Sequence, residues 1–383
     1  MDRKFKPVSI IAVDLILLVG MVWLSACSPA EIPPPTQTND LPQELAQTYI
    51  EQGDLPSAVI AWEEYLQTQN PQDAEAHYQL GLLLLILDPD SAKNQLEQAE
   101  TLDPTLTEQI SRLKSALRQA GAVEDKAYHF TIAGQALASI NEWSLAEIAL
   151  EMAVTENPEY AEAWAYLGET RQQTGSPGSL DELQTAHAIK PDGFSVNLFL
   201  GIYYRRVGKP MVALPYLEKA AEQDPNSLSL QADLAQTEVE TGQVSKAFER
   251  LYALVDSSPD DPVRWLMLAR LSIENNLQII QDGLPAARQA SVFAPEDPQP
   301  IVLIGRAYLL MDQPLLAERF LLQAVELDPD LSEPHYYLGI LYLNTNQSSS
   351  AENQLQITKT LAQSSGDPVF SILAEKLLEE YFP

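Results

Sequence analysis

The 383-residue sequence contains a single cysteine, Cys27, and only four histidines. One cysteine excludes an internal disulfide, so no disulfide contributes to folding. It also excludes a metal site built from several cysteines and histidines. No HExxH, GxSxG or P-loop motif occurs, and no two histidines are four residues apart. The sequence therefore offers no catalytic constellation, and we expect no enzyme, no metal and no cofactor.

Basic residues are also scarce, with 23 lysines and arginines against 54 aspartates and glutamates and a net charge of −31. Phosphate binding requires clustered basic side chains, so we expect no nucleic-acid partner. The same scarcity argues against a polybasic contact with anionic lipids. Two interpretations of the acidity remain. It forms a solvated surface that keeps the protein soluble, or it attracts a basic partner.

The one cysteine ends an N-terminal segment that is typical of exported proteins. Residues 1–6 carry three basic side chains, residues 8–24 are apolar apart from Ser9 and Asp14, and Ser25 and Ala26 directly precede Cys27. This pattern resembles the lipobox of bacterial lipoproteins. The resemblance implies that a signal peptide of residues 1–26 is removed and that the thiol of Cys27 carries a lipid.

An uncleaved anchor helix is the alternative for this segment. The 17 residues from 8 to 24 are marginal for a membrane span, which needs about 20. A carboxylate such as Asp14 near the centre of a span would cost about 2.5–3.5 kcal/mol. Both alternatives place the rest of the chain outside the cytoplasm, attached to a bacterial cell membrane or outer membrane.

Residues 28–43 (SPAEIPPPTQTNDLPQ) are rich in proline and show no apolar periodicity. Such a composition predicts a semi-rigid, extended linker. At about 3.1 Å per residue it would hold the following domain roughly 50 Å from the membrane.

The remainder of the chain is built from copies of one segment, best seen at 298–331 (PQPIVLIGRAYLLMDQPLLAERFLLQAVELDPDL). Apolar residues at 301, 304, 307 and 308 predict a first amphipathic helix. Pro314 marks the start of a second helix, and Pro329 marks its end because the residue before a proline leaves the helical region. Neither helix has enough apolar surface to be stable alone, so the hairpin is completed by stacking on its copies.

Counting Pro298 as position 1, the copies share a small residue at position 8, alanine at 20, a large apolar residue at 24 and proline at 32. Small residues let the two helices approach closely, and we expect the large residue to fill the gap between hairpins. The closing prolines are those at 71, 104, 158, 191, 225, 259, 295 and 329. This pattern resembles the tetratricopeptide repeat, whose period is 34 residues. The resemblance implies an all-α fold, a right-handed α-solenoid of about nine hairpins.

One spacing between closing prolines exceeds the repeat, and the excess predicts an extra helix at 105–119. Either this helix divides the array at a hinge near 120–124, or it is a degenerate repeat that stacks without a break. The first reading gives an N-terminal arm at 44–120 and a main array at 124–362. Repeat seven is two residues longer around 277–280, with Gly283 where alanine is expected. Residues 367–383 predict a final helix that covers the open end of the stack.

The resemblance also implies a working surface, since positions 2, 5, 6, 9, 12 and 13 of the first helices line the concave face of such arrays. The candidate partner-binding residues at these positions are Tyr166, Phe199, Arg205, Arg206, Arg270, Arg306, Tyr336 and Tyr337. Arg270 and Arg306 share position 9 of neighbouring repeats and could hold a carboxylate between them. Alternatively they pair with an acid of the chain itself, such as Glu274. The Lys/Asn clamp that one subfamily uses for chaperone C-termini is absent.

These observations predict a non-enzymatic, membrane-anchored lipoprotein that binds proteins or peptides in a concave groove. The alternative is a structural scaffold subunit of an envelope assembly or a polysaccharide-export complex.

Overall fold

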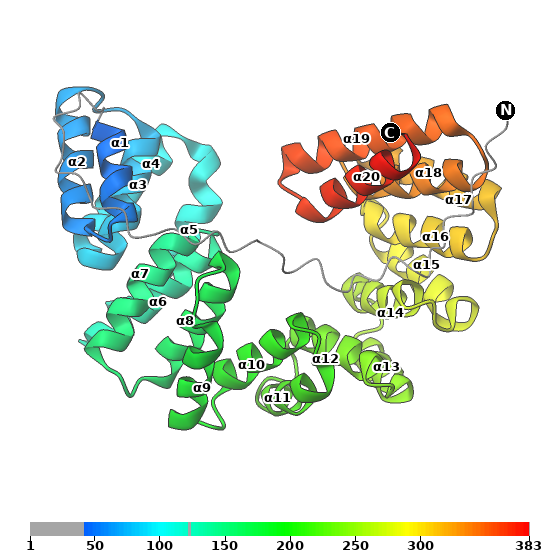
Figure 1. The fold of residues 1–383 in the computed structure, drawn as a ribbon, viewed down its shortest axis with the longest axis horizontal. Coiled ribbons are helices and arrows are strands. Elements are labelled where there is room, and N and C mark those ends of the chain that lie inside the picture. The colour runs from blue at the N-terminus through cyan, green and yellow to red at the C-terminus, as the bar shows by residue number, and fades with distance from the viewer. Residues whose placement is uncertain (1–41, 122–123, 383) are drawn as a thin grey trace. The chain divides into compact units, whose positions relative to one another are not determined.

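The computed structural model describes residues 42–121 and 124–382 (Figure 1). Within these residues it contains twenty α-helices and no strand, which confirms the predicted all-α solenoid. None of the helices in these ranges is long and apolar enough to cross a membrane. The predicted lipid site at Cys27 lies outside the described residues, as does the linker up to residue 41.

The helices pair into nine hairpins, with α5 and α20 as additional single helices. The first helix of each hairpin is α1 (Pro42–Glu51), α3 (Ala74–Leu87), α6 (Lys126–Ser139), α8 (Ala161–Thr174), α10 (Phe194–Arg206), α12 (Leu228–Glu240), α14 (Pro262–Glu274), α16 (Pro298–Leu310) and α18 (Ser332–Asn344). The second is α2 (Leu55–Thr68), α4 (Pro89–Leu102), α7 (Trp143–Glu156), α9 (Ser179–Ile189), α11 (Pro210–Gln223), α13 (Val244–Ser257), α15 (Leu284–Phe293), α17 (Pro314–Leu327) and α19 (Ser348–Ser365).

In eight of the nine described hairpins, the turn depends on one residue in the left-handed region at position 15. Glycine, asparagine or aspartate occupies it, because these residues adopt positive φ most readily. In seven of these hairpins the N–H of the next residue donates to the carbonyl five residues back, as from Gln313 to Tyr308 (2.9 Å). In repeat four the N–H of Ser176 donates instead to Thr174 Oγ1 (3.3 Å). The position-15 residues with positive φ are Gly53, Asn141, Gly175, Gly208, Gly242, Asn276, Asp312 and Asn346. Repeat two has the shorter turn that its sequence predicts, with Asp88 between α3 and α4.

In five hairpins the residue at position 4 of the first helix fixes the hairpin to the loop before it. Its side chain bonds the carbonyl of the closing proline six residues earlier, although these side chains differ in kind. The pairs are His77 with Pro71 (3.2 Å), Trp164 with Pro158 (2.8 Å), Asn197 with Pro191 (2.9 Å), Gln231 with Pro225 (3.1 Å) and Trp265 with Pro259 (2.7 Å). A shared backbone acceptor therefore explains why histidine, tryptophan and amides alternate at this position.

The large residue at position 24 does not act as predicted. In six hairpins it packs on the position-8 glycine of its own hairpin, as Leu217 does on Gly201. A Cβ atom on Gly201 would lie 2.5 Å from Leu217 Cδ2. The expectation that this residue fills the gap between hairpins is therefore wrong for these contacts. It fills the space that the missing Cβ leaves between the two helices of one hairpin.

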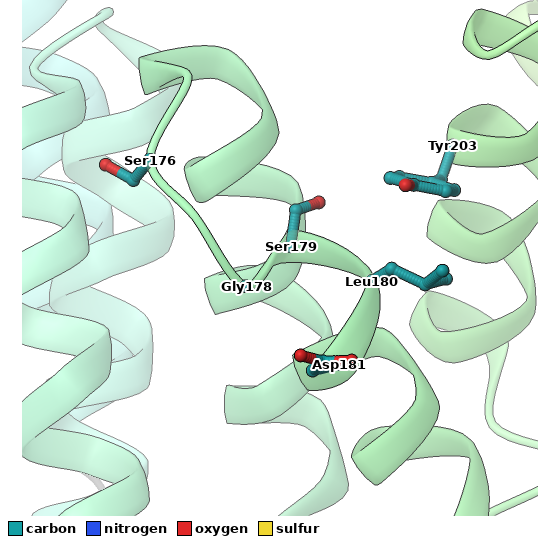
Figure 2. A pocket seen from close by; sticks show the side chains of 6 residues that line it. All are labelled: Ser176, Gly178, Ser179, Leu180, Asp181 and Tyr203. Carbon is teal, nitrogen blue, oxygen red and sulfur yellow. The ribbon is translucent and has the colours of Figure 1, made fainter. Parts of the chain in front are cut away.

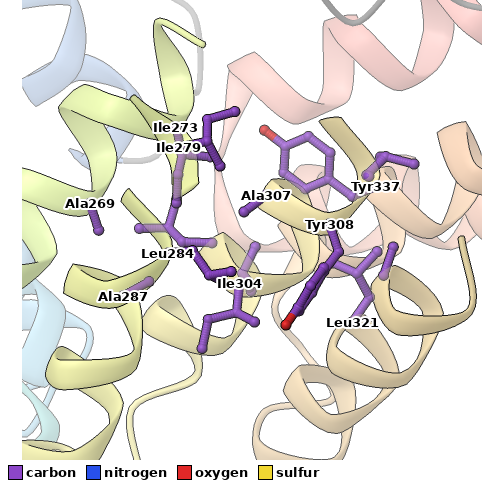
Figure 3. Close-up of a cluster of buried hydrophobic side chains, with 14 of the residues drawn as sticks. Ala269, Ile273, Ile279, Leu284, Ala287, Ile304, Ala307, Tyr308, Leu321 and Tyr337 are labelled. Atoms are coloured by element: carbon purple, nitrogen blue, oxygen red, sulfur yellow. The ribbon is translucent and has the colours of Figure 1, made fainter. Parts of the chain in front are cut away.

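The described chain divides into two compact units, at 42–224 and 225–382. The first contains a large buried cluster running from Ala46 to Ala149, with smaller clusters farther along its helices. The second has one continuous cluster from Ala235 to Leu377. Figure 3 shows part of this cluster, where Leu284, Ile304 and Leu321 lie among the helices of repeats seven to nine.

The predicted extra helix is present as α5 (Thr107–Ala120), preceded by a short 3₁₀ turn, η2 (Pro104–Leu106). Its residues Ile110 and Leu113 are fully buried in the cluster that also contains Ala133 and Leu137 of α6. α5 thus packs directly on α6 through this shared cluster. The division between compact units falls at 224/225 and not at 120–124.

The lengthening of repeat seven takes the form of a π-helical turn, η3 (Ile279–Gly283), before α15. Gln278 precedes it with φ of 47°. Gly283 is needed here because a Cβ atom would clash with Ser272 Oγ and would lie 2.8 Å from Ile273 Cγ1. The glycine that replaces the expected alanine therefore lets this turn approach α14.

The final helix, α20 (Pro368–Tyr381), begins at Asp367, whose carboxylate accepts the N–H groups of Val369 (2.9 Å) and Phe370 (3.3 Å). It packs mainly on α19 and buries Leu377 in the cluster of the second unit. A salt bridge from Lys359 to Glu375 (2.9 Å) lies along the same contact.

Candidate protein-binding surface

The first helices line the inner side of each unit. Neighbouring first helices contact one another directly, α6 with α8 and α8 with α10 in the first unit, and α14 with α16 and α16 with α18 in the second. Within the described residues, neighbouring second helices such as α7 and α9 make no comparable contact. A curved stack brings helices on its inner side closer together than those outside. The predicted groove positions therefore lie on the concave side.

In the first unit, the predicted residues Tyr166 and Phe199 form an edge-to-face pair between α8 and α10. Their ring centroids are 4.9 Å apart at an angle of 75°, the preferred geometry for aromatic pairs. Both side chains remain partly exposed. Burial raises the pKa of Tyr166, as does the nearby Glu162, while a hydrogen bond with Ser195 lowers it.

Arg206 fixes the opposite end of the same two helices. Its Nη1 donates to Glu169 Oε1 (2.9 Å) and to Gln172 Oε1 (2.8 Å), both on α8. The Arg206 side chain is 38% exposed, whereas that of Glu169 is 13% exposed. The neighbouring Arg205 is half-buried and also has an interaction partner. The guanidinium of Arg206 is therefore held in place while part of it faces solvent.

In the second unit, Arg270 and Arg306 converge on one carboxylate of the chain itself. Arg270 Nη1 lies 3.2 Å and Arg306 Nη1 lies 3.6 Å from Glu274 Oε1. Arg270 Nη2 also donates to the amide oxygen of Gln299. The side chain of Arg306 is only 17% exposed. This is the pairing with Glu274 that the sequence offered as the alternative to an external carboxylate.

A second acid in this cluster was not predicted. Glu333, at position 2 of repeat nine, is 8% exposed. Burial raises the pKa of its carboxyl and Glu274 raises it further, while Arg270, Arg306 and a hydrogen bond from Gln299 lower it. The sequence could have indicated Glu333 as a groove residue, because it shares position 2 with Gln299. Its position alone did not show that the side chain is buried. Two arginines and two glutamates thus lie in one cluster, in which both arginines pair with Glu274 and burial dominates at Glu333.

Tyr336 and Tyr337 belong to this cluster and are 3% and 7% exposed. Arg306 lies over the ring of Tyr337, 5.2 Å from its centroid. Tyr336 packs edge-to-face on Tyr337 and on Phe370 of α20, each at 5.4 Å. Burial raises the pKa of Tyr336 to about 12. The expectation that these two rings form an open surface does not fit their burial, which instead supports Arg306 and the contact with α20.

Figure 2 shows a separate, open pocket of about 270 Å³ in the first unit. It lies where Tyr203 of α10 faces Leu180 and Ser179 of α9, and it is also lined by Ser176, Gly178 and Asp181. The hollow exists because Gly175 and Gly178, both with positive φ, delay the start of α9 to Ser179. Asp181 is the only ionisable acid lining it, so it offers no acid–base pair.

The described ranges contain no group of three or more histidine, cysteine or acidic side chains placed to hold a metal. Two of the histidines serve the hairpins instead. His77 Nδ1 lies 2.6 Å from Gln95 Oε1, and His335 Nδ1 lies 2.7 Å from Gln354 Oε1, each linking the two helices of one hairpin.

Four segments of the chain match family models of the tetratricopeptide repeat, at residues 44–88, 206–271, 299–331 and 320–353. No curated protein matches the sequence. Among solved structures, PilW, described as a widely conserved type IV pilus biogenesis factor, is 17% identical, with a TM-score of 0.47 over 56% of this chain and 100% of PilW.

Yeast Tom70 is 14% identical, with a TM-score of 0.45 over 88% of this chain and 89% of Tom70. The pilF protein of Pseudomonas aeruginosa is 17% identical, with a TM-score of 0.43 over 55% of this chain and 96% of pilF. These likenesses concern the fold alone.

Proposed function

We propose that this tetratricopeptide-repeat protein is a non-enzymatic, membrane-anchored lipoprotein that binds proteins or peptides through the inner side of its first helices. Repeat hairpins of this kind are interaction modules, and a helix-lined groove suits an extended or helical segment of a partner.

The observation that carries the proposal is the partly exposed pair of Tyr166 and Phe199, together with the fixed Arg206 farther along the same two helices. Aromatic and arginine side chains supply most of the affinity at protein interfaces. A guanidinium that is already held by Glu169 loses little conformational entropy on binding. These groups lie along two neighbouring first helices of one compact unit, so a single extended partner segment could contact all of them.

The membrane anchor is supported by the sequence around Cys27, where a basic start, an apolar run and small residues precede the only cysteine. A lipid on Cys27 and the proline-rich linker that follows would keep the start of the first repeat within roughly 50 Å of the membrane. Partners in or near the same membrane would then meet the groove at a raised effective concentration.

Site-specific crosslinking tests the binding surface. A photoreactive phenylalanine analogue replaces Phe199 in the full chain in its native envelope, and the same analogue replaces Met211 as the matched control. Met211 lies on the second helix of the same hairpin and is 70% exposed. We expect defined crosslinked proteins from position 199 and none of them from position 211. Equal crosslinking at both positions would remove the inner side of α10 from the binding surface.

The set of proteins crosslinked from position 199 also distinguishes the two functional alternatives. Transient partners in varying amounts would support a binding protein, whereas a small set of membrane proteins in constant ratio would make the chain a scaffold subunit. The anchor has its own test, because Cys27→Ser should abolish metabolic labelling with a radioactive fatty acid. Unchanged labelling of that variant would contradict the lipid site.

A further inference from the structure

The N-terminal ends of α6, α8 and α10 bring aromatic and acidic side chains together on the concave side of the first unit. We call this set the aromatic–acidic patch. It consists of Tyr128, Tyr160, Tyr166, Phe199, Asp125 and Glu162. Tyr128 and Glu162 occupy position 2 of neighbouring repeats, and Tyr166 and Phe199 occupy position 6, so the sequence register itself aligns them. All four rings are partly exposed.

The rings and carboxylates of the patch lie close to one another. Tyr166 and Phe199 are in edge-to-face contact at 4.9 Å. Tyr160 and Tyr166 both pack on the small cluster that contains Val154 and Leu167. The pKa of the Tyr160 hydroxyl is raised to about 12, first by burial and then by Glu162, Tyr128, Asp125 and Tyr166. Glu162 and Asp125 are the two charged groups of the patch, so its charge at neutral pH is negative.

Neither carboxylate of the patch is neutralised within the described residues. The contact of the exposed Glu162 side chain is with the neutral amide of Gln135, whose Nε2 lies 3.4 Å from Glu162 Oε1. Asp125 caps α6 by accepting the N–H of Tyr128 (3.0 Å). Other acids of the inner surface differ in this respect, since Glu169 and Glu274 are paired with arginines. Among the described residues, no lysine or arginine side chain forms a salt bridge with a carboxylate of the patch.

The charge of the whole unit acts in the same direction. Residues 42–224 contain 28 acidic and 11 basic side chains, a net charge of −17. Such a surface attracts basic segments and repels acidic ones over a distance of about 8–10 Å at moderate salt.

We infer that the aromatic–acidic patch binds a basic segment of a partner protein, with a lysine or arginine side chain lying across the rings of Tyr160 and Tyr166 and its charge meeting Glu162. A cation over an aromatic ring is attracted by the negative face of the π-system. The apolar stem of the same side chain covers ring carbon that would otherwise stay in contact with water. An acidic segment would face repulsion, and an apolar one would desolvate Glu162 without compensation. This inference rests on the proposed function and adds the chemical class of the partner.

The test uses the full chain in non-ionic detergent and a fluorescein-labelled peptide of five glycine–arginine repeats, with binding measured by fluorescence anisotropy. The matched control peptide contains citrulline in place of arginine, which keeps the shape and removes the charge. We expect Glu162→Gln to weaken binding of the arginine peptide about three- to fivefold. Tyr166→Leu should weaken it to a similar extent, whereas Tyr166→Phe, which keeps the ring, should bind as the unmodified chain does.

General attraction to an acidic protein is the competing explanation, and Glu97→Gln controls for it. Glu97 is an exposed acid on the second helix α4, so this variant changes the net charge by the same amount. An equal effect of Glu97→Gln and Glu162→Gln would overturn the inference, and so would equal binding of the citrulline peptide or no binding of the arginine peptide. None of these results would affect crosslinking from position 199, which tests the proposed function separately.

Discussion

Gly305 and Leu321 are in direct contact across the two helices of repeat eight. A Cβ atom on Gly305 would lie 2.7 Å from Leu321 Cγ and 2.8 Å from Leu321 Cδ2. Such distances are shorter than any contact that two carbon atoms tolerate, so glycine sets how closely α16 approaches α17. The same relationship joins Gly81 to Leu96, Gly134 to Leu150, Gly168 to Leu183, Gly201 to Leu217 and Gly339 to Leu355.

Replacing Gly305 with valine should therefore separate α16 from α17. We expect Gly305→Val to lower the free energy of unfolding of the second unit by about 1–3 kcal/mol, the usual cost of overfilling a packed core. Urea unfolding followed by circular dichroism measures the change.

A double variant identifies the cause. Leu321→Ala removes the side chain that the new valine would meet, so the combination with Gly305→Val should be less destabilising than the sum of the two single changes. Additive effects would show that the loss comes from helix propensity and not from the contact. Gln323→Val, at an exposed position of α17, gives the cost of a valine where nothing is crowded.

The repeat pattern was sufficient to predict the hairpins but not their packing partners. Positions 8, 20, 24 and 32 indicated the helices and the turns because each depends on local chemistry, such as the missing N–H of proline. The contact of position 24 with position 8 of its own hairpin does not follow from local chemistry. A large residue at position 24 could equally pack on the next hairpin. The division at 224/225 was also missed, because the repeat signature continues across it without interruption.

For the candidate surface, the sequence placed the residues in register and could not show their burial. Arg270 and Arg306 occupy equivalent positions, as predicted, and both reach Glu274. Tyr336 occupies an equivalent position to Val302 and Leu266, yet whether such a ring faces solvent depends on α20, whose Phe370 covers it. Periodicity gives the face of a helix on which a residue lies, whereas exposure depends on neighbours that are distant in the sequence.

Trp265, at position 4 of α14, and Trp62, at position 24 on α2, differ in whether the indole N–H has a hydrogen-bond partner. Trp265 Nε1 donates to the Pro259 carbonyl at 2.7 Å, whereas Trp62 Nε1 is buried without a hydrogen-bond partner in the described structure. We expect Trp265→Phe to lose about 1 kcal/mol for the hydrogen bond in addition to the loss of ring area.

Trp62→Phe removes a buried donor that has no partner, and this change is favourable. The variant should therefore lose stability only through the smaller buried area of its ring. The comparison requires stability measurements on both variants and on Trp164→Phe, which should resemble Trp265→Phe because Trp164 bonds Pro158 at 2.8 Å. Equal losses at positions 62 and 265 would show that the proline carbonyl contributes nothing to stability.

Leu377 should stabilise the last hairpin through α20. Its side chain is 7% exposed and belongs to the cluster of the second unit. Leu377→Ala should cost about 2–3 kcal/mol and should speed amide hydrogen exchange in α18 and α19, which α20 covers. Ile372 on the same helix is 45% exposed, so Ile372→Ala should change neither quantity appreciably. Unchanged exchange in Leu377→Ala would mean that α20 is not a cap.

We expect the carboxylate of Glu142 to lower the stability of the first unit at neutral pH. Burial raises the pKa of its carboxyl, and the charge of Glu75 raises it further. Below the pKa of the unfolded chain both states are protonated, so the group has no effect. As the pH rises from there through the folded pKa, the folded state holds the proton more tightly than the unfolded state, and stability falls until the folded carboxyl is also ionised.

Glu142→Gln should therefore raise the melting temperature at pH 7 by about 1–2 °C, the change expected for a fraction of 1 kcal/mol in a unit of this size. The gain should disappear at pH 3. Glu156→Gln, at the exposed end of α7, is the matched control for removing one carboxylate. An equal gain of Glu142→Gln at both pH values would mean that the charge of Glu142 is not its cause.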